Sequence, residues 1–185
     1  MIDYKTFKKE YLNEWVDKSQ AARKAAEELA SKETRSSLRD IYKPQNVTLT
    51  LNDKLIEFRG EYEKKANGDI YFTWGEAMKY FGEPDKDGWR LPTSDELQAL
   101  KKDFSYEFDK DGEQGIFGSL LRLPAMGYRT ESHGVTNEGN FGSYWTSTPI
   151  QQNNAWALDF YSEKANMLNC PRTDGLCVCL VRDVN

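Results

Sequence analysis

Three cysteines lie close together near the C-terminal end of this 185-residue chain, at Cys170, Cys177 and Cys179. Thiolates can bind zinc or pair as a disulfide, and each of these requires a defined geometry. Cys177 and Cys179 are two residues apart on an expected strand, too far for a relaxed disulfide. A zinc site of three thiolates would lack a fourth ligand at a suitable spacing. We therefore interpret them as reduced thiols that act as small side chains, and we expect no metal and no cofactor.

The other side chains suited to chemistry are scattered along the chain. His133 is the single histidine, and no serine or aspartate is placed to form a nucleophilic triad with it. The triplet Glu83-Pro84-Asp85 resembles a lectin calcium triplet, but it lies between two expected helices. The acidic run of Asp109, Asp111 and Glu113 lacks the closing bidentate glutamate of a calcium loop. We therefore expect no catalytic residues and predict that the protein is not an enzyme.

The alternating sequence AWALDFY indicates a working surface near the C-terminus. Its large apolar positions are Trp156, Leu158 and Phe160. The positions between them are Ala157, Asp159 and Tyr161. Period-two alternation is typical of a half-buried strand, in which successive side chains point to opposite faces. We expect the apolar set to pack in the core with Trp145, and the second set to face outward.

Turns then position further residues beside this outward set. A turn is expected near Ser162 and a bend at Gly175, so residues 168–174 can return next to the strand. In that interpretation Leu168 supplies apolar contact, while Thr173 and Asp174 supply polar orientation. The sequence therefore predicts a contiguous exposed surface that binds a ligand.

The N-terminal part of the chain, residues 1–44, has the pattern of helix. Tyr4, Phe7, Tyr11 and Trp15 are spaced by three or four residues, as on one face of a helix. Pro44 ends the segment because proline cannot continue a helix. Two roles stay open: an appendage that docks on the main domain, or an element for self-association or attachment to a larger structure.

The remaining residues, 45–185, form the second predicted domain. Residues 46–72 alternate as strands, with a turn at Asn67-Gly68. Thr73 and Glu76 form a capping box that opens a short helix, and Ser94 is expected to cap a second one. A long irregular section is predicted over about residues 129–143.

Composition excludes several classes of partner. The net charge is -5, which does not favour nucleic acid, and no apolar run approaches the length of a membrane span. The first residues lack the apolar centre of a signal peptide. We therefore expect no nucleic-acid partner, no membrane span and no export by the ordinary route.

Five motifs in a fixed order carry a family likeness. They are Phe72-Thr73-Trp74-Gly75-Glu76-Ala77, Trp89-Arg90-Leu91-Pro92-Thr93, Leu123-Pro124-Ala125, Gly142-Ser143-Tyr144-Trp145-Thr146 and Val181-Arg182-Asp183. Over about residues 70–183 the chain resembles the Fibrobacter-type paralogous domain and its relatives in gut Bacteroidetes and their phages. The resemblance implies an α+β, C-type-lectin-like fold. Such a fold has two helices, a small twisted antiparallel sheet and a long loop excursion, here preceded by the N-terminal helical segment.

The C-terminal stretch is similar to the variable proteins of diversity-generating retroelements. That family displays a randomised binding face on a stable backbone. The resemblance implies framework residues at Trp145, Trp156, Phe160, Met167, Arg172 and Gly175. It implies diversified, ligand-binding positions at Ala157, Asp159, Tyr161, Leu168, Cys170, Pro171, Thr173 and Asp174. Cys177 and Cys179 depart from the family pattern.

Three functions follow as alternatives. The first is a non-catalytic receptor-binding protein of a phage or its host, with an unidentified protein or cell-surface ligand and a location in the cytoplasm or on a phage particle. The second is an undiversified structural or adhesion domain. The third is an enzyme like those that generate formylglycine, although likeness of fold does not transfer chemistry.

Overall fold

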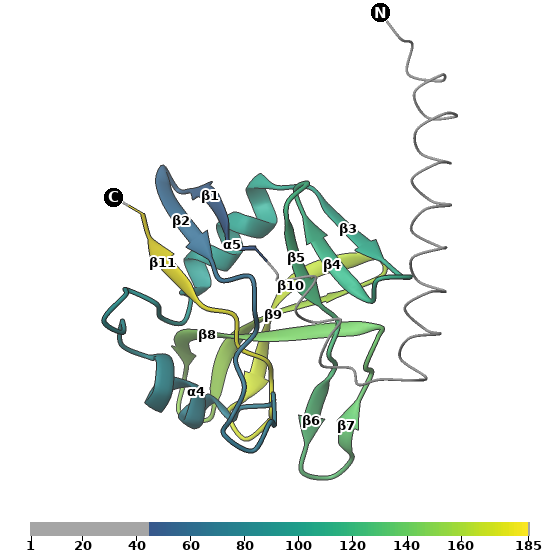
Figure 1. Ribbon diagram of the computed structural model, residues 1–185. Coiled ribbons are helices and arrows are strands. Elements are labelled where there is room, and N and C mark those ends of the chain that lie inside the picture. Colours follow the sequence, from purple (N-terminus) through teal and green to yellow (C-terminus); the bar gives the residue numbers. More distant parts are fainter. Residues whose placement is uncertain (1–44, 185) are drawn as a thin grey trace, which may run out of the picture. The chain divides into compact units, whose positions relative to one another are not determined.

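The computed structural model describes residues 45–184 (Figure 1). Within this range the chain forms eleven strands and two helices. The predicted helical segment over residues 1–44 lies outside the described residues, and so does its predicted role in assembly. The division of the chain into 1–44 and 45–185 therefore stays a prediction.

In the described residues two strands precede the two helices, and nine strands follow them. In chain order the elements are β1 Val47–Leu51, β2 Lys54–Phe58, α4 Trp74–Phe81, α5 Ser94–Asp103, β3 Tyr106–Asp109, β4 Gln114–Phe117, β5 Leu121–Pro124, β6 Tyr128–Thr130, β7 Gly134–Thr136, β8 Phe141–Ile150, β9 Asn154–Tyr161, β10 Lys164–Pro171 and β11 Val181–Asp183.

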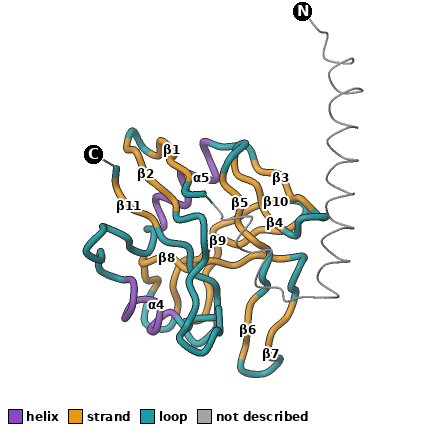
Figure 2. The backbone as a smooth tube through the Cα atoms, in the orientation of Figure 1, coloured by secondary structure: helices purple, strands orange, loops and turns teal. Residues whose placement is uncertain are grey.

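The strands form four small antiparallel sheets, with strand orders β1-β2-β11, β3-β4-β5, β6-β7 and β10-β9-β8. Figure 2 shows strands along much of the described backbone, with short helical segments at α4 and α5. The predicted α+β, C-type-lectin-like class is therefore wrong, because the described part of the chain is mostly β-structure in several sheets.

The expected loop excursion accounts for part of this error. The glycine-rich residues 105–143 form short strands, including the β6-β7 hairpin in the section predicted to be irregular. Gly118 follows β4 directly and Gly134 is the first residue of β7, and their φ angles are 62° and 66°. Glycine adopts such positive φ angles without steric cost. The many glycines in this section therefore indicate tight turns between short strands, and not one long loop.

The two short helices lie where the sequence predicted them. Thr73 caps α4 and forms the predicted capping box with Glu76. The cap of α5 is Thr93 and not Ser94, because the Thr93 hydroxyl accepts a hydrogen bond from the Glu96 backbone N–H. The glutamate three residues after Thr93 was the signal that distinguishes the two candidate caps.

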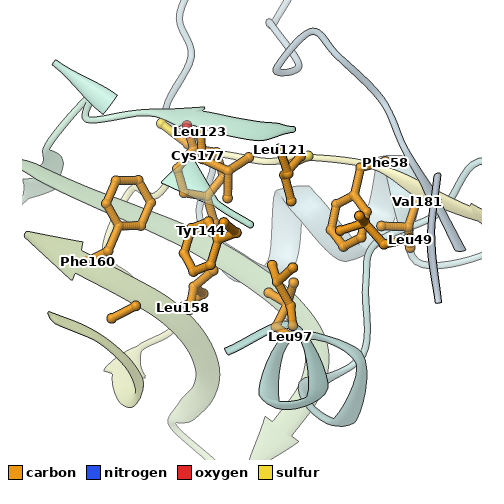
Figure 3. Close-up of a cluster of buried hydrophobic side chains, with 14 of the residues drawn as sticks. Leu49, Phe58, Leu97, Leu121, Leu123, Tyr144, Leu158, Phe160, Cys177 and Val181 are labelled. Atoms are coloured by element: carbon orange, nitrogen blue, oxygen red, sulfur yellow. The ribbon is translucent and has the colours of Figure 1, made fainter. Parts of the chain in front are cut away.

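The β10-β9-β8 sheet packs against a hydrophobic cluster on each face. One cluster, shown in part in Figure 3, includes Tyr144, Leu158 and Phe160. The other includes Trp145, Ala155 and Ala157. Alternation along β9 therefore separates two packed faces, so the simple division into an inner and an outer face was wrong.

Four aromatic and aliphatic positions test the predicted core. Trp89 and Leu91 are buried, as predicted. Trp145 is fully buried, and its indole N–H donates to the Phe72 carbonyl oxygen at 2.7 Å. Trp156 is only half-buried, contrary to the prediction. It lines a cavity of about 200 Å³ against the first turns of α5, together with Ser94, Asp95, Gln98 and Met167.

A polar cluster, here called the Arg90 clasp, joins α5 to the last strand. It consists of Arg90, Thr93, Glu96 and Asp183. The Arg90 guanidinium donates two hydrogen bonds to Glu96, at 2.9 and 2.7 Å, and one to Asp183 at 3.1 Å. Burial raises the pKa of Glu96, but the hydrogen bonds from Arg90 and Thr93 more than offset this and hold it below its ordinary value. Glu96 is thus an ionised, fully partnered group.

Candidate ligand-binding face

Strand register brings most of the predicted binding residues to one face of the β10-β9-β8 sheet. Asn166 lies opposite Asp159, and Leu168 lies opposite Ala157. On the other side of β9, Ser143 lies opposite Asp159. Residues directly opposite each other in an antiparallel pair point to the same face. We call this surface, with the turn that follows β10, the Asp159 face.

The predicted residues differ widely in exposure on this face. Ala157 is fully buried, and the relative solvent exposure of Asp159 is only 6%. The prediction that both residues are exposed was therefore wrong. The second hydrophobic cluster includes Ala155 and Ala157 and covers this end of the β9 face, which accounts for the burial of Ala157. The half-buried members are Tyr161, Cys170 and Asp174. The exposed ones are Leu168, at 45%, Pro171 and Thr173.

Pro171 does not belong to the Asp159 face. It pairs with Asn154 in the register, one residue out of phase with Cys170, which pairs with Ala155. Successive residues of a strand point to opposite sides of the sheet. Pro171 therefore lies on the other side, and the structure does not bring it together with Leu168 and Cys170.

Asp159 has an unusual environment for a carboxylate. The Ser143 hydroxyl donates a hydrogen bond to Asp159 Oδ1, and it is the only hydrogen-bond partner of this side chain within residues 45–184. Burial raises the pKa of Asp159 to about 6, and the bond from Ser143 lowers it only in part. A buried carboxylate with few donors favours its neutral form. Such perturbed groups are often found at functional sites.

Cys170 and Asp174 extend this environment toward the turn after β10. Burial raises the pKa of the Cys170 thiol to about 12, with further contributions from the charges of Asp159 and Asp174. Burial also raises the pKa of Asp174, assisted by the charge of Glu131. The Cys170 thiol is therefore protonated at neutral pH and is a poor nucleophile.

An aromatic row borders the Asp159 face. The rings of Tyr128 and Phe141 are 5.6 Å apart, and those of Phe141 and Tyr161 are stacked at 6.2 Å. The Lys164 ammonium group lies 6.0 Å from the Tyr161 ring centroid. Half-exposed aromatic rings offer large contact areas with little loss of side-chain entropy on binding. Tyr128 and Phe141 were not among the predicted site residues, because the strand pairing that brings Phe141 opposite Tyr161 cannot be read from the sequence.

The β6-β7 hairpin forms one side of a hollow next to this face. A cavity of about 350 Å³ is lined by Thr73, Arg129, Thr130, Glu131, Gly134, Thr173 and Gly175. Reciprocal backbone hydrogen bonds of 2.8 and 2.7 Å join Arg129 and Gly175 and hold the hairpin to the turn after β10. Thr173, a predicted binding residue, therefore lies where the hairpin and the sheet meet.

The remaining candidate groups have structural partners. His133 is exposed at the turn of the hairpin, with its Nδ1 2.6 Å from the Ser132 hydroxyl. Asp85 accepts hydrogen bonds from the backbone of Asp87 and Trp89. Asp109 accepts hydrogen bonds from the backbone of Gly112 and from the Gln114 amide. In the described part of the chain, no three His, Cys, Asp or Glu side chains are grouped closely enough to hold a metal ion.

Comparison with known families identifies the domain. Residues 50–182 match the family described as the Lcl C-terminal domain, and this match spans more than half of the chain. The chain therefore belongs to the Lcl C-terminal domain family. No curated protein matched the chain. No solved structure matched it either. Over residues 45–184, no helix is long and apolar enough to cross a membrane.

Proposed function

We propose that this protein is a non-catalytic ligand-binding protein whose binding surface is the Asp159 face. The supporting observation is the convergence of Tyr161, Leu168 and Cys170 on one sheet face. The turn that carries Thr173 and Asp174 follows directly. Rigid strands position these side chains, and recognition sites on such scaffolds keep their geometry. The ligand is a protein or a cell-surface group.

We also propose that part of this face is diversified, in keeping with the resemblance to retroelement variable proteins. Exposed positions such as Leu168 and Thr173 make few packing contacts, so replacing them changes stability little. The buried positions Ala157 and Asp159 do not have this freedom, because enlarging them would disturb a packed core. The proposal therefore excludes the buried part of β9. It places variation at the remaining predicted positions of the Asp159 face, Tyr161, Leu168, Cys170, Thr173 and Asp174.

A second candidate is an undiversified structural or adhesion domain. The burial of Ala157 and Asp159 favours it, because two of the positions expected to vary contribute to the core. The genomic neighbourhood separates the two candidates. An adjacent reverse transcriptase and a near-copy of the last coding stretch would support diversification, and their absence would support the second candidate.

A combined variant tests the binding face. Leu168→Ser and Thr173→Ala should each lower the free energy of unfolding by about 0.5 kcal/mol or less, because both sites are exposed. Tyr161→Ser removes a half-buried ring stacked on Phe141 and should cost about 1–2 kcal/mol, so the combined variant, which carries all three changes, should stay folded. The three changes together should remove binding of the fluorescently labelled full chain to intact cells of gut Bacteroidetes, scored by flow cytometry. The matched control carries Leu55→Ser and Val135→Ser, two exposed apolar residues outside the Asp159 face. It should melt and bind as the original chain does.

The proposal fails if the combined variant unfolds, because the residues would then be core residues. It also fails if the original chain, the combined variant and the control bind equally well, because binding would then not depend on this face.

A further inference from the structure

We propose that a groove beside helix α4 binds a small aromatic carboxylate. The groove, here called the Tyr80 groove, has a volume of about 510 Å³. It is lined by Glu63, Lys64, Lys65, Ala66, Asn67, Phe72, Tyr80 and Phe81. It shares no residue with the Asp159 face, so it is independent of the function proposed above. Its volume falls in the range of about 300–1,000 Å³ that is typical of small-molecule sites.

One wall of the groove is an aromatic row that runs from the core to the solvent. Phe72 is 1% exposed and contacts Phe81 edge to face, with ring centroids 5.6 Å apart. Phe81 and Tyr80 are 6.1 Å apart, and Tyr80 is 60% exposed. Aromatic pairs prefer edge-to-face or offset arrangements. A flat ring entering the groove can therefore continue this row against Tyr80 and Phe81.

The charged side chains at the groove that do not form ion pairs are positive. The Lys65 ammonium pairs with Glu76 at 2.8 Å and with Asp69 at 3.5 Å. The Glu63 carboxylate pairs with Arg59 at 2.6 Å. The charged groups of these two lining residues are thus already neutralised.

Two further lysines have no such compensation. Lys64 lines the groove and Lys79 lies beside it, with its ammonium 5.6 Å from the Tyr80 ring centroid. Among residues 45–184 neither lysine forms an ion pair. An ammonium group donates strong hydrogen bonds to a carboxylate. The carboxylate of an aromatic ligand is therefore attracted here, although the chain as a whole has a net charge of -5.

The segment 63–67, which also lines the groove, is held in place by backbone hydrogen bonds before any ligand arrives. Backbone hydrogen bonds join Lys65 to Asp69 at 2.7 Å and Gly68 to Lys65 at 2.9 Å, and the Glu63 N–H donates to the Val178 carbonyl at 3.0 Å. Gly68 has a φ angle of 84°, which closes the turn. A preformed wall spares the entropy of ordering a loop on binding.

The test uses the ¹⁵N-labelled full chain, titrated with 2-naphthoate and separately with its neutral counterpart 2-naphthamide. We expect 2-naphthoate to shift the backbone amide resonances of residues 64–67 and 80–81. We expect 2-naphthamide to bind roughly tenfold more weakly, which corresponds to about 1.4 kcal/mol for one charge-assisted interaction.

Variants separate the two parts of the site. Tyr80→Ala should weaken both ligands, while Lys64→Ala with Lys79→Ala should remove the preference for naphthoate over naphthamide. The matched controls are Leu120→Ala, at another highly exposed apolar residue, and Lys54→Ala, at an exposed lysine of β2. Both controls should bind as the original chain does. Equal affinity for the two ligands, or shifts confined to other regions, would overturn the proposal.

Discussion

Glu96 in the Arg90 clasp and Asp159 on the Asp159 face are both largely removed from solvent, yet their pKa values move in opposite directions. Glu96 receives two hydrogen bonds from Arg90 and two from Thr93. Asp159 receives one, from Ser143. Burial raises the pKa of both, and only at Glu96 do the donors outweigh it. The number and charge of the donors, rather than burial, decide the sign.

The difference separates two uses of a carboxylate. Glu96 fixes the start of α5 and, through Arg90, the last strand, so its ionised form stabilises the fold. Asp159 has one hydrogen-bond donor from the described residues and lies near a surface that we propose to bind a ligand. Carboxylates with a perturbed pKa are often found at functional sites.

The largest expected effect is at the clasp. Glu96→Ala leaves the part-buried Arg90 guanidinium without its bidentate partner and removes the capping box, so the free energy of unfolding should fall by roughly 3–5 kcal/mol. Asp183→Ala is the control, since it removes the more exposed partner of the same guanidinium. That change should alter stability by about 1 kcal/mol or less. Denaturant unfolding measures both, and equal effects would mean that Glu96 has no special role.

The next effect is at Asp159 and depends on pH. The pKa is about 6 in the folded protein against an ordinary value of 3.8. The folded state therefore holds this proton more tightly, and the stabilisation is present below about pH 4 and lost as pH rises through about 6. Asp159→Asn should remove this loss, so its stability relative to the original chain should rise by roughly 2–3 kcal/mol between pH 4 and pH 8.

Thermal or denaturant unfolding at several pH values gives this difference directly. Asp174→Asn serves as the comparison, because Asp174 is only half-buried and its pKa, although raised by burial, should have a smaller effect. If the difference in free energy of unfolding between the original chain and Asp159→Asn does not change with pH, the pKa of Asp159 is not raised in the folded protein and the expectation is wrong.

The smallest effect concerns the single donor to Asp159. Ser143→Ala removes the hydrogen bond that lowers the pKa of Asp159, so this pKa should rise above 6. At pH 8 the variant should be less stable by about 1 kcal/mol, the net value of one such bond. The titration of the Asp159 carboxyl carbon, followed by NMR, measures the pKa. Thr146→Ser, in the same strand, keeps a hydroxyl that can donate to the Trp156 carbonyl and should leave that titration unchanged.

Part of the candidate site followed from local sequence. The alternation in AWALDFY correctly separated Ala157, Asp159 and Tyr161 from their neighbours, and the turn after Tyr161 joins β9 to β10 as predicted. The prediction that the face with Ala157, Asp159 and Tyr161 is exposed to solvent was wrong. A cluster that includes Phe72, Trp89 and Leu176, which are distant in sequence, covers the part of that face at Ala155 and Ala157. Alternation along one strand carries no information about such distant segments.

The sequence by itself determined the local elements of this protein. Thr73 with Glu76 specified where α4 begins, and the alternation of Val47–Leu51 specified β1, because caps and strand periodicity depend on neighbours in the chain. Only the tertiary structure decided the division into four sheets, the burial of Asp159 and the half-exposed position of Trp156. These depend on which segments pack together, and that choice is made by contacts between residues far apart in sequence.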